Sequence, residues 1–403
     1  MHDAGPLVSL EDALRTIDDT LAGWRLPAEI VPTRSALGQV LAFDHASALD
    51  LPPFDKAAVD GYAICAESTD GCYRVLKTIA AGDSGIPNLE ACTAVKVMTG
   101  APVPKNTLRV VMVEDSELLP AQAGAIVRLR SGGQPNFCPH GEDMRRGGLA
   151  LKAGQLLRPL DVANLTGCGI ASVDVVRRPR MAVISTGDEI VDDPARLAPG
   201  KIMNVNGPLL CGLAAANGLD LIREFSAKDT AADIGAALES ALQSAEVIAL
   251  SGGLSVGDYD FALEEFSRAG LKLHFSRVAV KPGKPTAFAT KPGKVVFGLP
   301  GNPLSVFLMF HLMVLRAVAR LTGSESRTKT FALPLAAGFK RRKAERAEFV
   351  PATVTPNGLV LPLECHGSAH LLSLTHADGF FAVPLGAKEV TAGTRVEFMM
   401  VRQ

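Results

Sequence analysis

Apolar and polar positions along the chain change their spacing several times, which predicts several domains rather than one. From Leu10 to Leu21 apolar residues recur at helical spacing, and Ser9 and Asp12 resemble a helix-capping pair. Between residues 51 and 148, short Val-rich runs alternate with Pro and Gly, a pattern typical of strands joined by turns. The chain therefore opens with an amphipathic helix and continues into a β-rich region.

From residue 181 onward the pattern alternates between strands and helices. Apolar runs predict strands at residues 181–185, 221–225, 247–250 and 295–299. Strands that alternate with helices form a parallel sheet covered on both faces, which is the doubly wound α/β class. Ligands of such sheets bind beyond the carboxyl ends of the strands. We therefore expect the functional residues in the turns at that edge.

The apolar run from Val306 to Leu315 has its own interpretation. It contains His311, is followed by Arg316 and Arg320, and is shorter than the roughly 20 residues that a membrane-spanning helix needs. We therefore predict a helix buried in the protein core.

The changes of pattern indicate four domains. The segment Arg177-Arg178-Pro179-Arg180 is typical of a hinge, and after Gly323 short strands separated by prolines return. We predict a helix-containing N-terminal domain in two pieces (1–50 and 140–178), a β-rich insert (51–139), an α/β domain (179–324) and a C-terminal β-barrel (325–403). The fold class is therefore α/β plus β in a multidomain chain.

Composition and charge exclude several classes of function. Lysine and arginine sum to 41 against 42 for aspartate and glutamate, so the formal net charge is −1 and no global field attracts nucleic acids or anionic membranes. Aromatic residues make up only 5%, too few for a base-stacking surface. The seven cysteines contain no C-x-x-C pair, and the N-terminus lacks the pattern of a signal peptide. We expect a cytoplasmic protein that binds neither nucleic acid nor membrane, with the basic run at residues 340–343 on a solvated face.

A Gly-rich turn follows the strand at residues 247–250. In Ser251-Gly252-Gly253-Leu254-Ser255-Val256-Gly257 a strand passes into a helix, which places backbone N–H groups and hydroxyls where a phosphate binds. Asp258 and Asp260 follow, and carboxylates beside a phosphate require a bridging divalent cation such as Mg²⁺. Asp188 and Glu189, at a neighbouring strand end, would converge on the same ion. The alternative is an ordinary tight turn.

Two further turns carry chemistry of the same kind. Lys281-Pro282-Gly283-Lys284-Pro285 holds two ammonium groups on a loop stiffened by prolines, which suits a multiply charged anion. Pro300-Gly301-Asn302-Pro303 allows close backbone approach to a ligand, with Ser305 at the start of the next helix. Each has an ordinary alternative, a solvated hairpin loop and a helix-initiating turn. Several such turns at one sheet edge nevertheless favour a shared ligand site.

Seven motifs occur in order along the chain. They are the three turns above, the last extended to Leu299, with Asp60-Gly61-Tyr62-Ala63, Thr99-Gly100-Ala101-Pro102, Gly141-Glu142-Asp143 and Ser185-Thr186-Gly187-Asp188-Glu189. With these motifs the sequence resembles the molybdopterin molybdenumtransferases, the MoeA and gephyrin E-domain family, over essentially its whole length. This set of motifs in order is highly specific.

The resemblance implies an elongated homodimer that inserts molybdenum from molybdate into adenylylated molybdopterin, with Mg²⁺, and releases AMP. The α/β domain would bind the pterin nucleotide, and the insert of the other subunit would close the cleft. Catalytic roles are implied for Asp60, Thr99, Asp143, Glu189, Asp229, Asp260, Lys281 and Lys284, with Glu189 and Asp260 as metal ligands. Nucleotide contacts are implied for Ser185, Thr186, Gly187, Asp188, Asn204, Asn206, Ser251, Gly252, Gly253, Ser255, Gly257, Pro300, Gly301, Asn302, Pro303 and Ser305. Partners would be a molybdopterin adenylyltransferase and the apoproteins of molybdoenzymes.

Three places depart from the family pattern. Ala57 stands where the family commonly has serine, Cys138 where it has arginine, and Thr107-Leu108-Arg109 where it has Ala-Asp-Ala-like residues. Lys56 would return a positive charge to that face. Two alternatives therefore stay open: a non-catalytic or specialised paralogue that binds the molybdopterin nucleotide, and an adenylyltransferase like MogA.

Overall fold

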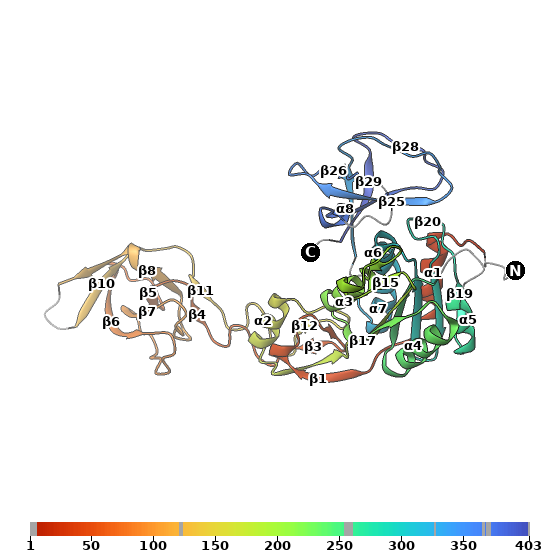
Figure 1. Cartoon of the computed structure of the whole chain (residues 1–403). Helices are drawn as coiled ribbons and strands as arrows, with labels where there is room; N and C mark the ends of the chain where they lie inside the picture. The colour runs from red at the N-terminus through yellow and green to blue at the C-terminus, as the bar shows by residue number, and fades with distance from the viewer. Residues whose placement is uncertain are drawn as a thin grey trace. The chain divides into compact units, whose positions relative to one another are not determined.

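The structure, a computed structural model, describes residues 6–120, 124–253, 261–325, 328–364, 367 and 372–401. The chain divides into two compact units (Figure 1). The first unit comprises Met1–Glu29, Gly38–Val40 and Val176–Gln403, and the second comprises Ile30–Leu37 and Leu41–Val175. The α/β region and the C-terminal β-rich region therefore share the first unit.

A six-stranded sheet forms the centre of the first unit, in the order β17-β14-β18-β22-β21-β19. Its strands are β14 (Arg180–Thr186), β17 (Asp220–Ala227), β18 (Val247–Ser251), β19 (Lys272–Phe275), β21 (Ala287–Lys291) and β22 (Lys294–Leu299). The four strands predicted from the apolar runs, β14, β17, β18 and β22, pair in parallel as expected. β21 is antiparallel to β22, because the two residues between them permit only a hairpin, and β19 is antiparallel to β21. The sheet is therefore mixed.

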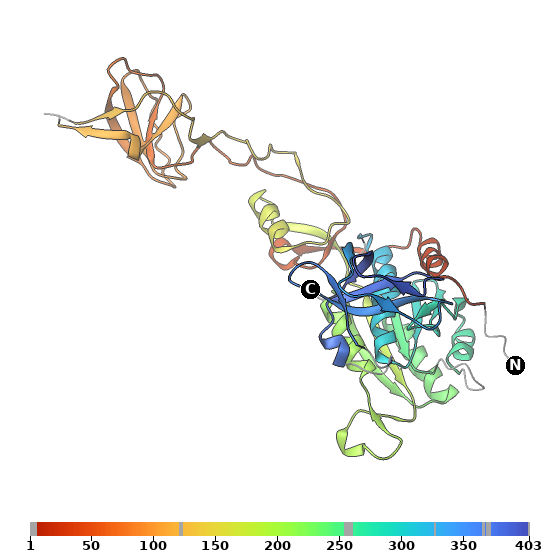
Figure 2. The ribbon, with the colours of Figure 1, turned by 90° about the horizontal axis from the view of Figure 1, so that it is seen from above.

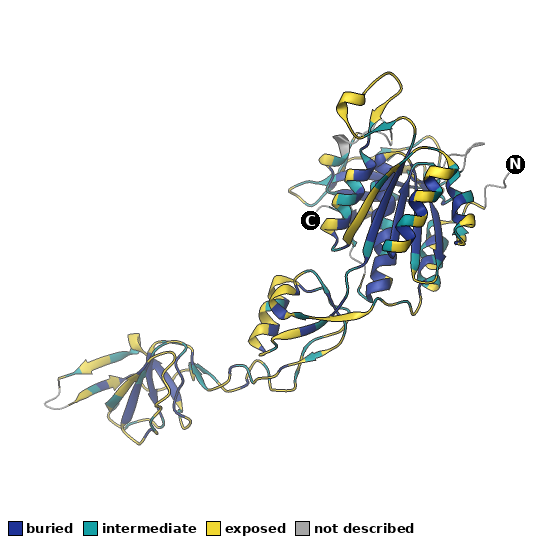
Figure 3. Cartoon of the chain, turned by 60° about the horizontal axis from the view of Figure 1, so that its bottom comes forward, coloured by how far each residue is buried: buried dark blue, intermediate teal, exposed yellow. Residues whose placement is uncertain are grey.

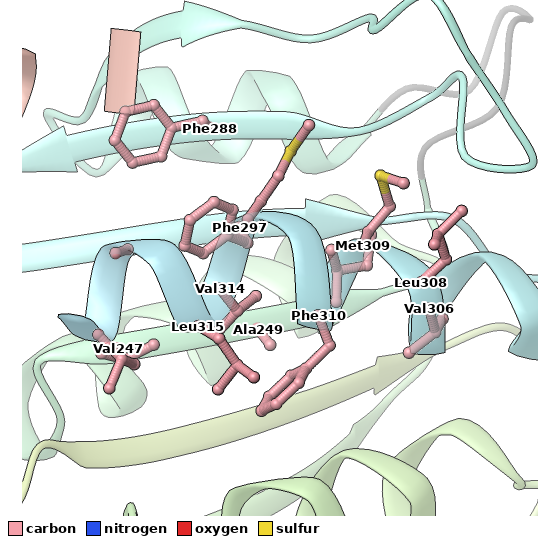
Figure 4. Close-up of a cluster of buried hydrophobic side chains, with 14 of the residues drawn as sticks. Val247, Ala249, Phe288, Phe297, Val306, Leu308, Met309, Phe310, Val314 and Leu315 are labelled. Carbon is pink, nitrogen blue, oxygen red and sulfur yellow. The ribbon is translucent and has the colours of Figure 1, made fainter. Parts of the chain in front are cut away.

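Helices cover both faces of this sheet. One face carries α1 (Leu10–Thr20), α3 (Asn206–Ala216), α6 (Pro303–Met309) and α7 (Leu315–Thr322), and the other carries α4 (Ala231–Ser244) and α5 (Phe261–Arg268). Successive strand residues point to opposite faces, so Val247 and Ala249 join the first core and Ile248 joins the second. Figure 4 shows Val247 and Ala249 of β18 in one buried cluster with Phe310. In Figure 3 the buried strands lie between helices whose outer sides are exposed.

The predicted buried helix is longer than the apolar run from Val306 to Leu315. It runs without a break over Pro303–Thr322, with a five-residue π-helical segment at Phe310–Val314 between α6 and α7. Its 20 residues are long and apolar enough to cross a membrane, so the expectation that it is too short was wrong. However, 78% of the most apolar 18-residue stretch of this helix is buried inside the protein. Burial in the core therefore explains why the helix is so apolar.

The first helix packs against α7 rather than against residues 30–50. Asp18 of α1 accepts hydrogen bonds from Arg316 Nε at 2.9 Å and Arg320 Nε at 2.7 Å. Burial raises the pKa of Asp18, but the hydrogen bonds and charges of the two arginines outweigh it and lower the pKa to about 2. Residues up to Glu29 therefore group with the first unit, whereas the sequence pattern placed them with residues 140–178.

The C-terminal region is a β-sheet domain that takes in one strand from the α/β region. Its sheet consists of β20 (Val280–Lys281), β25 (Ala347–Val354), β27 (Gly379–Val383), β29 (Arg395–Met400) and β23 (Lys329–Pro334), with β26 (Val360–Pro362) paired to β25. A two-stranded ribbon joins β24 (Phe339–Lys340) and β28 (Glu389–Val390), and α8 covers Leu372–Thr375. β20 precedes the α/β strand β21 and pairs in parallel with β25. The turn with the two lysines is therefore bound to both domains.

Residues 187–203 extend from the carboxyl end of β14 as a loop (Figure 2). The two ends of the loop are held together by the short strands β15 (Ile190–Val191) and β16 (Ile202–Met203), which pair in parallel. Asp192 accepts hydrogen bonds at 2.8 Å from both Asn204 and Ser226, which fixes this base next to β17.

The second unit is mainly β-structure, as the Val-rich runs predicted. Its largest sheet has the order β8-β5-β7-β6-β10-β9 and is built from β5 (Gly61–Ile64), β6 (Cys72–Ile79), β7 (Thr93–Val97), β8 (Arg109–Met112), β9 (Ser116–Leu119) and β10 (Ala125–Leu129). Smaller pairs join β4 (Lys56–Ala57) to β11 (Phe137–Cys138) and β3 (His45–Ala46) to β12 (Leu149–Leu151). Beside α2 (Pro159–Gly167) lies the three-stranded sheet β1-β13-β2, with strands Ala28–Pro32, Ser172–Val176 and Val40–Leu41.

The link between α1 and α7 predicts a stability that depends on pH. Asp18→Asn should lower the free energy of unfolding at pH 7 by about 1–2 kcal/mol, a value reduced for screening because both arginines are partly exposed. The pKa of Asp18 is depressed in the fold, so its contribution is present above pH ~4 and is lost as the pH falls through about 2. Fluorescence of Trp24, the single tryptophan, reports urea unfolding because it packs against the same core.

The matched control is Asp19→Asn, because Asp19 is exposed on the same helix. It should change the free energy of unfolding by less than about 0.5 kcal/mol. An Asp18 variant that is as stable as the parent protein at pH 7 would contradict the assignment.

Candidate functional site

A cavity of about 1520 Å³ lies in the first unit at the carboxyl ends of β14, β18 and β22. β14 and β18 are neighbours in the sheet, but the chain continues from β14 to β17 on one side and from β18 to β19 at the opposite edge. Such a switch point is where open α/β sheets bind their ligands. The opposite wall comes from the C-terminal domain, chiefly Phe339, Arg346, Glu348, Phe349 and Leu363.

Most residues predicted to contact the nucleotide line this cavity. They are Thr186, Gly187, Asn204, Asn206, Ser251, Gly252, Gly253, Pro300, Gly301, Asn302, Pro303 and Ser305. Four residues predicted to be catalytic line it too, Glu189, Asp229, Lys281 and Lys284. Ser185 and Asp188 adjoin lining residues, while Ser255, Gly257 and Asp260 lie outside the described residues. Their roles stay predictions, but the fold brings the described ones together.

Four buried polar atoms at this sheet edge have no hydrogen-bond partner within the described part of the chain. They are Ser185 Oγ, Thr186 Oγ1, Asn206 Oδ1 and Asp229 Oδ1. Leaving a buried polar group unsatisfied costs about 1–3 kcal/mol, and native proteins rarely accept it without a reason. Thr186, Asn206 and Asp229 line the cavity and Ser185 adjoins it, so a polar ligand bound there would lie beside these unpartnered atoms.

The side chain of Asn206 connects the carboxyl ends of β18 and β22 by hydrogen bonds. Its Nδ2 atom donates to Ser251 Oγ at 2.8 Å and to the carbonyl of Gly301 at 2.6 Å, so the start of α3 holds the turns after β18 and β22. Only 5% of Asn206 is exposed. Its nitrogen is fully used within the protein, which leaves the side-chain oxygen for a donor on the ligand.

The Gly-rich turn after β18 requires glycine for steric reasons. Gly252 has a φ of +95°, and a Cβ atom there would lie 2.3 Å from the carbonyl oxygen of Thr186. Gly253 also has a positive φ, +65°. The backbone of this turn therefore approaches β14 more closely than any other residue type would allow.

The acidic side chains form a second feature of the cavity. The backbone N–H of Asp229 donates to Asp188 Oδ1 at 3.3 Å. Burial, and then the charges of Asp188 and Glu189, raise the pKa of Asp229 above its ordinary value. Among the residues that the structure describes, no three His, Cys, Asp or Glu side chains are arranged to hold a metal ion. The predicted pair of Glu189 with Asp260 falls partly outside that set.

The turn with the two lysines is held by the protein and is not a solvated hairpin loop. Val278 and Thr286 donate backbone hydrogen bonds to the carbonyl of Lys284, at 2.9 and 3.0 Å. The buried Thr286 hydroxyl donates to the carbonyl of Gly283 at 2.7 Å. Lys281 Nζ forms an ion pair with Glu348 Oε1 at 2.7 Å. These contacts fix the backbone of the turn, and the ion pair holds the Lys281 ammonium at the cavity wall.

The second unit contains the remaining predicted residues. Asp60 Oδ1 accepts hydrogen bonds from the backbone N–H and the hydroxyl of Thr99, each at 2.7 Å, and these bonds lower the pKa of Asp60. Asp143 is exposed and donates its backbone N–H to Leu51. Lys56 pairs with Cys138 across β4 and β11, so their side chains share one face. The hypothesis that Lys56 returns a positive charge to the face of Cys138 requires this arrangement.

The sequence patterns did not predict that residues of the C-terminal domain form one wall of the cavity. Arg346 and Glu348 lie at the start of β25, and nothing in their local sequence shows that this strand pairs with β20. The signal available was weak: a charged residue on each side of Ala347 in an otherwise apolar strand.

Three family models match the chain. They are the MoeA N-terminal region (domain I and II) at residues 8–169, a probable molybdopterin binding domain at 182–320, and the MoeA C-terminal region (domain IV) at 333–401. Together they cover most of the sequence in the order expected from its motifs.

Similar proteins extend over nearly the whole chain. A molybdopterin molybdenumtransferase of Staphylococcus aureus is 31% identical over 93% of this chain and 91% of its own length. One from Staphylococcus epidermidis is 30% identical, over 91% and 89%. A crystal structure of the molybdopterin biosynthesis MoeA protein of Pyrococcus horikoshii superposes with a TM-score of 0.84 at 28% identity, covering 98% of this chain and 100% of that one.

The close approach at Gly252 predicts a local loss of stability on substitution. Gly252→Ala should lower the free energy of unfolding by about 1–3 kcal/mol, because the added Cβ meets the Thr186 carbonyl in a backbone conformation that alanine disfavours. Gly212→Ala is the matched control: it lies within α3, has no atom within 4 Å of the new Cβ, and should stabilise by about 0.5–1 kcal/mol. Urea unfolding measures both. Equal stability of the two variants would contradict this account of the turn.

Proposed function

The chain belongs to the MoeA family of molybdopterin molybdenumtransferases, the transferases of molybdenum cofactor biosynthesis, and we propose that the cavity of its first unit binds adenylylated molybdopterin and there exchanges AMP for molybdenum. The observation that carries this proposal is the set of four unpartnered polar atoms at the carboxyl edge of the sheet. The pterin nucleotide has ring nitrogens, hydroxyls and a pyrophosphate to complete their hydrogen bonds. The cavity, about 1520 Å³, is also large enough for so long a ligand.

The acidic side chains fit a divalent cation. Carboxylate oxygens are the ligands that Mg²⁺ prefers, and the Oδ1 atom of Asp229 is unpartnered beside two further negative charges. Glu189 and Asp229 would hold the ion, with Asp260, outside the described residues, as the third candidate. Bound there, Mg²⁺ would neutralise charge on the pyrophosphate. Without a cation, the same carboxylates would repel the ligand.

The lysines would act on the same group from the other wall. Lys281 and Lys284 line the cavity on a turn fixed by backbone hydrogen bonds, so their charges need little reorganisation during cleavage. Preorganised positive charge stabilises negative charge that develops on a leaving phosphate. The chain thereby binds the pyrophosphate, orients it and stabilises the departing AMP.

AMP release tests this proposal directly. Purified protein is incubated with adenylylated molybdopterin, Mg²⁺ and molybdate, and AMP is quantified chromatographically. Lys284→Ala should slow AMP release about 10- to 100-fold, because one preorganised charge is lost. Lys272→Ala, which removes an exposed lysine of β19, is the control and should leave the rate unchanged.

Two results would contradict the proposal. Parent protein that releases no AMP would favour a paralogue that only binds the nucleotide. Protein that consumes ATP to adenylylate molybdopterin would instead favour the adenylyltransferase alternative.

We also propose that the protein acts as a cytoplasmic homodimer in which the second unit of one subunit completes the cavity of the other. The support is the exposed Asp60–Thr99 pair, in which two hydrogen bonds orient the Asp60 carboxylate and lower its pKa. An ionised, oriented carboxylate outside any described cavity needs a partner surface to have a chemical role. A molybdopterin adenylyltransferase would supply the substrate, and apoproteins of molybdoenzymes would receive the product.

Mixing two inactive variants tests the shared site. Asp60→Ala and Glu189→Ala should each be inactive alone, whereas a preparation reassembled from equal amounts should recover about a quarter of the parent activity, because half of the dimers carry one intact site. The rate of AMP release measures recovery. If the mixture stays inactive while size-exclusion chromatography shows that mixed dimers form, each site is complete within one chain.

A further inference from the structure

One residue of the basic run at 340–343 is buried, contrary to the expectation of a solvated face. The side chain of Arg341 is 3% exposed, whereas that of Lys340 is 75% exposed. Arg341 donates to three carbonyl oxygens of the C-terminal domain, those of Ala387 at 2.7 Å, Arg346 at 2.8 Å and Pro384 at 2.5 Å. A guanidinium held at this many points has a fixed position.

Arg341 also contacts an acidic residue of the cavity wall. Its Nη1 atom lies 3.5 Å from Glu348 Oε2, and Glu348 Oε1 lies 2.7 Å from Lys281 Nζ. Glu348 itself is 8% exposed, and Lys281 is its register partner in the β20–β25 pair. Lys281 and Glu348 line the cavity, whereas Arg341 is absent from its described lining. The three residues therefore form a chain of alternating charge from the interior of the C-terminal domain to the cavity.

The charges of Lys281, Glu348 and Arg341 together affect how an anionic ligand is attracted to this wall. Lys281 and Glu348 alone would sum to zero, and the carboxylate would repel an anion that approached the ammonium. Arg341 brings the sum over these three residues to +1 from a position outside the cavity lining, in addition to the charges of Lys284 and Arg346 on the lining itself. It also occupies one carboxylate oxygen, so the other oxygen is directed at Lys281.

The side chain of Lys281 depends on the ion pair with Glu348 for a fixed position, because burial does not confine it. This side chain is 54% exposed, and a free lysine side chain loses conformational entropy when it is held in one place. The ion pair with Glu348 confines the ammonium before the ligand arrives. That confinement depends in turn on a carboxylate that is itself immobile.

We propose that Arg341 is a positioning residue of the transferase: through Glu348 it holds the Lys281 ammonium at the cavity wall, and it offsets the charge of the Glu348 carboxylate toward the pyrophosphate of the substrate. The proposal rests on the proposed function, because it names the pyrophosphate as the group that the wall receives. Arg341 touches neither substrate nor reacting atoms, and it acts only through Glu348 and Lys281.

A double-mutant cycle with inorganic pyrophosphate as the probe tests this relay. Isothermal titration calorimetry of the full chain at fixed ionic strength should show that Arg341→Met weakens binding about fivefold. In a Lys281→Ala background the same change should have no further effect, because the group on which Arg341 acts is gone. Arg341→Lys should restore most of the affinity, since it returns a cation facing Glu348. Arg342→Met, which removes the exposed neighbouring arginine, is the matched control and should bind like the parent.

The possible outcomes separate this inference from the proposed function. If Arg341→Met weakens binding equally in both backgrounds, Arg341 is merely structural and the inference is wrong while the proposed function stands. If the parent protein does not bind pyrophosphate in the cavity, the proposed function fails and the inference fails with it. Should Arg341→Met not fold by circular dichroism, Arg341→Gln, which is uncharged but keeps an amide donor for the carbonyl oxygens, replaces it in the same cycle and should weaken binding only where Lys281 is present.

Discussion

β20 pairs in parallel with β25, with Val280 opposite Ala347 and Lys281 opposite Glu348. This short pairing attaches a turn of the α/β region to the C-terminal sheet, and Arg346 strengthens it by donating to the carbonyl of Val280 at 3.1 Å. The cavity has two walls because of it: one from the strand ends of the α/β sheet and one from the C-terminal domain. Without the pairing, the lysines would lie on an ordinary surface loop, and Glu348 would have no charge partner on the α/β side.

The two edges of the central sheet show what distinguishes a structural site from a ligand site. At the amino edge, Glu246 is 8% exposed and fully engaged: Arg180 Nε donates to its Oε1 atom at 3.0 Å, and Arg177 Nη2 lies 3.1 Å from the same carboxylate. At the carboxyl edge, Ser185 and Thr186 are equally buried, yet their hydroxyls lack partners in the described chain. A buried ion pair satisfied within the protein contributes to the fold, whereas unsatisfied groups are retained when a ligand satisfies them. The contrast supports the carboxyl edge as the functional one.

The cavity also separates charge by sign. Asp188, Glu189 and Asp229 lie on the loops after β14 and β17, while Lys281 and Lys284 lie on the turn held by the C-terminal domain. An anion alone would be attracted by the lysines and repelled by the carboxylates, so a ligand with both a negative group and a bound divalent cation fits best. Nucleotide pyrophosphates with Mg²⁺ have this character. The proposed Mg²⁺-dependent chemistry rests on this arrangement of charge.

Local sequence was sufficient wherever the determining interactions are local or periodic. The stretches at 181–184 and 247–250 are apolar throughout because both faces of β14 and β18 are buried, and the turns that follow them contain the residues of the carboxyl edge. The Gly-rich motif likewise predicted a tight turn at position 252, but its close approach to the Thr186 carbonyl came only from the structure. Tertiary structure decided the rest: that α1 packs on α7, that β19 and β21 make the sheet mixed, and that Arg341 is buried while Lys340 is not. These features depend on pairings between segments far apart in the chain, such as Lys281 with Glu348, and no local periodicity records which distant strand a segment will join.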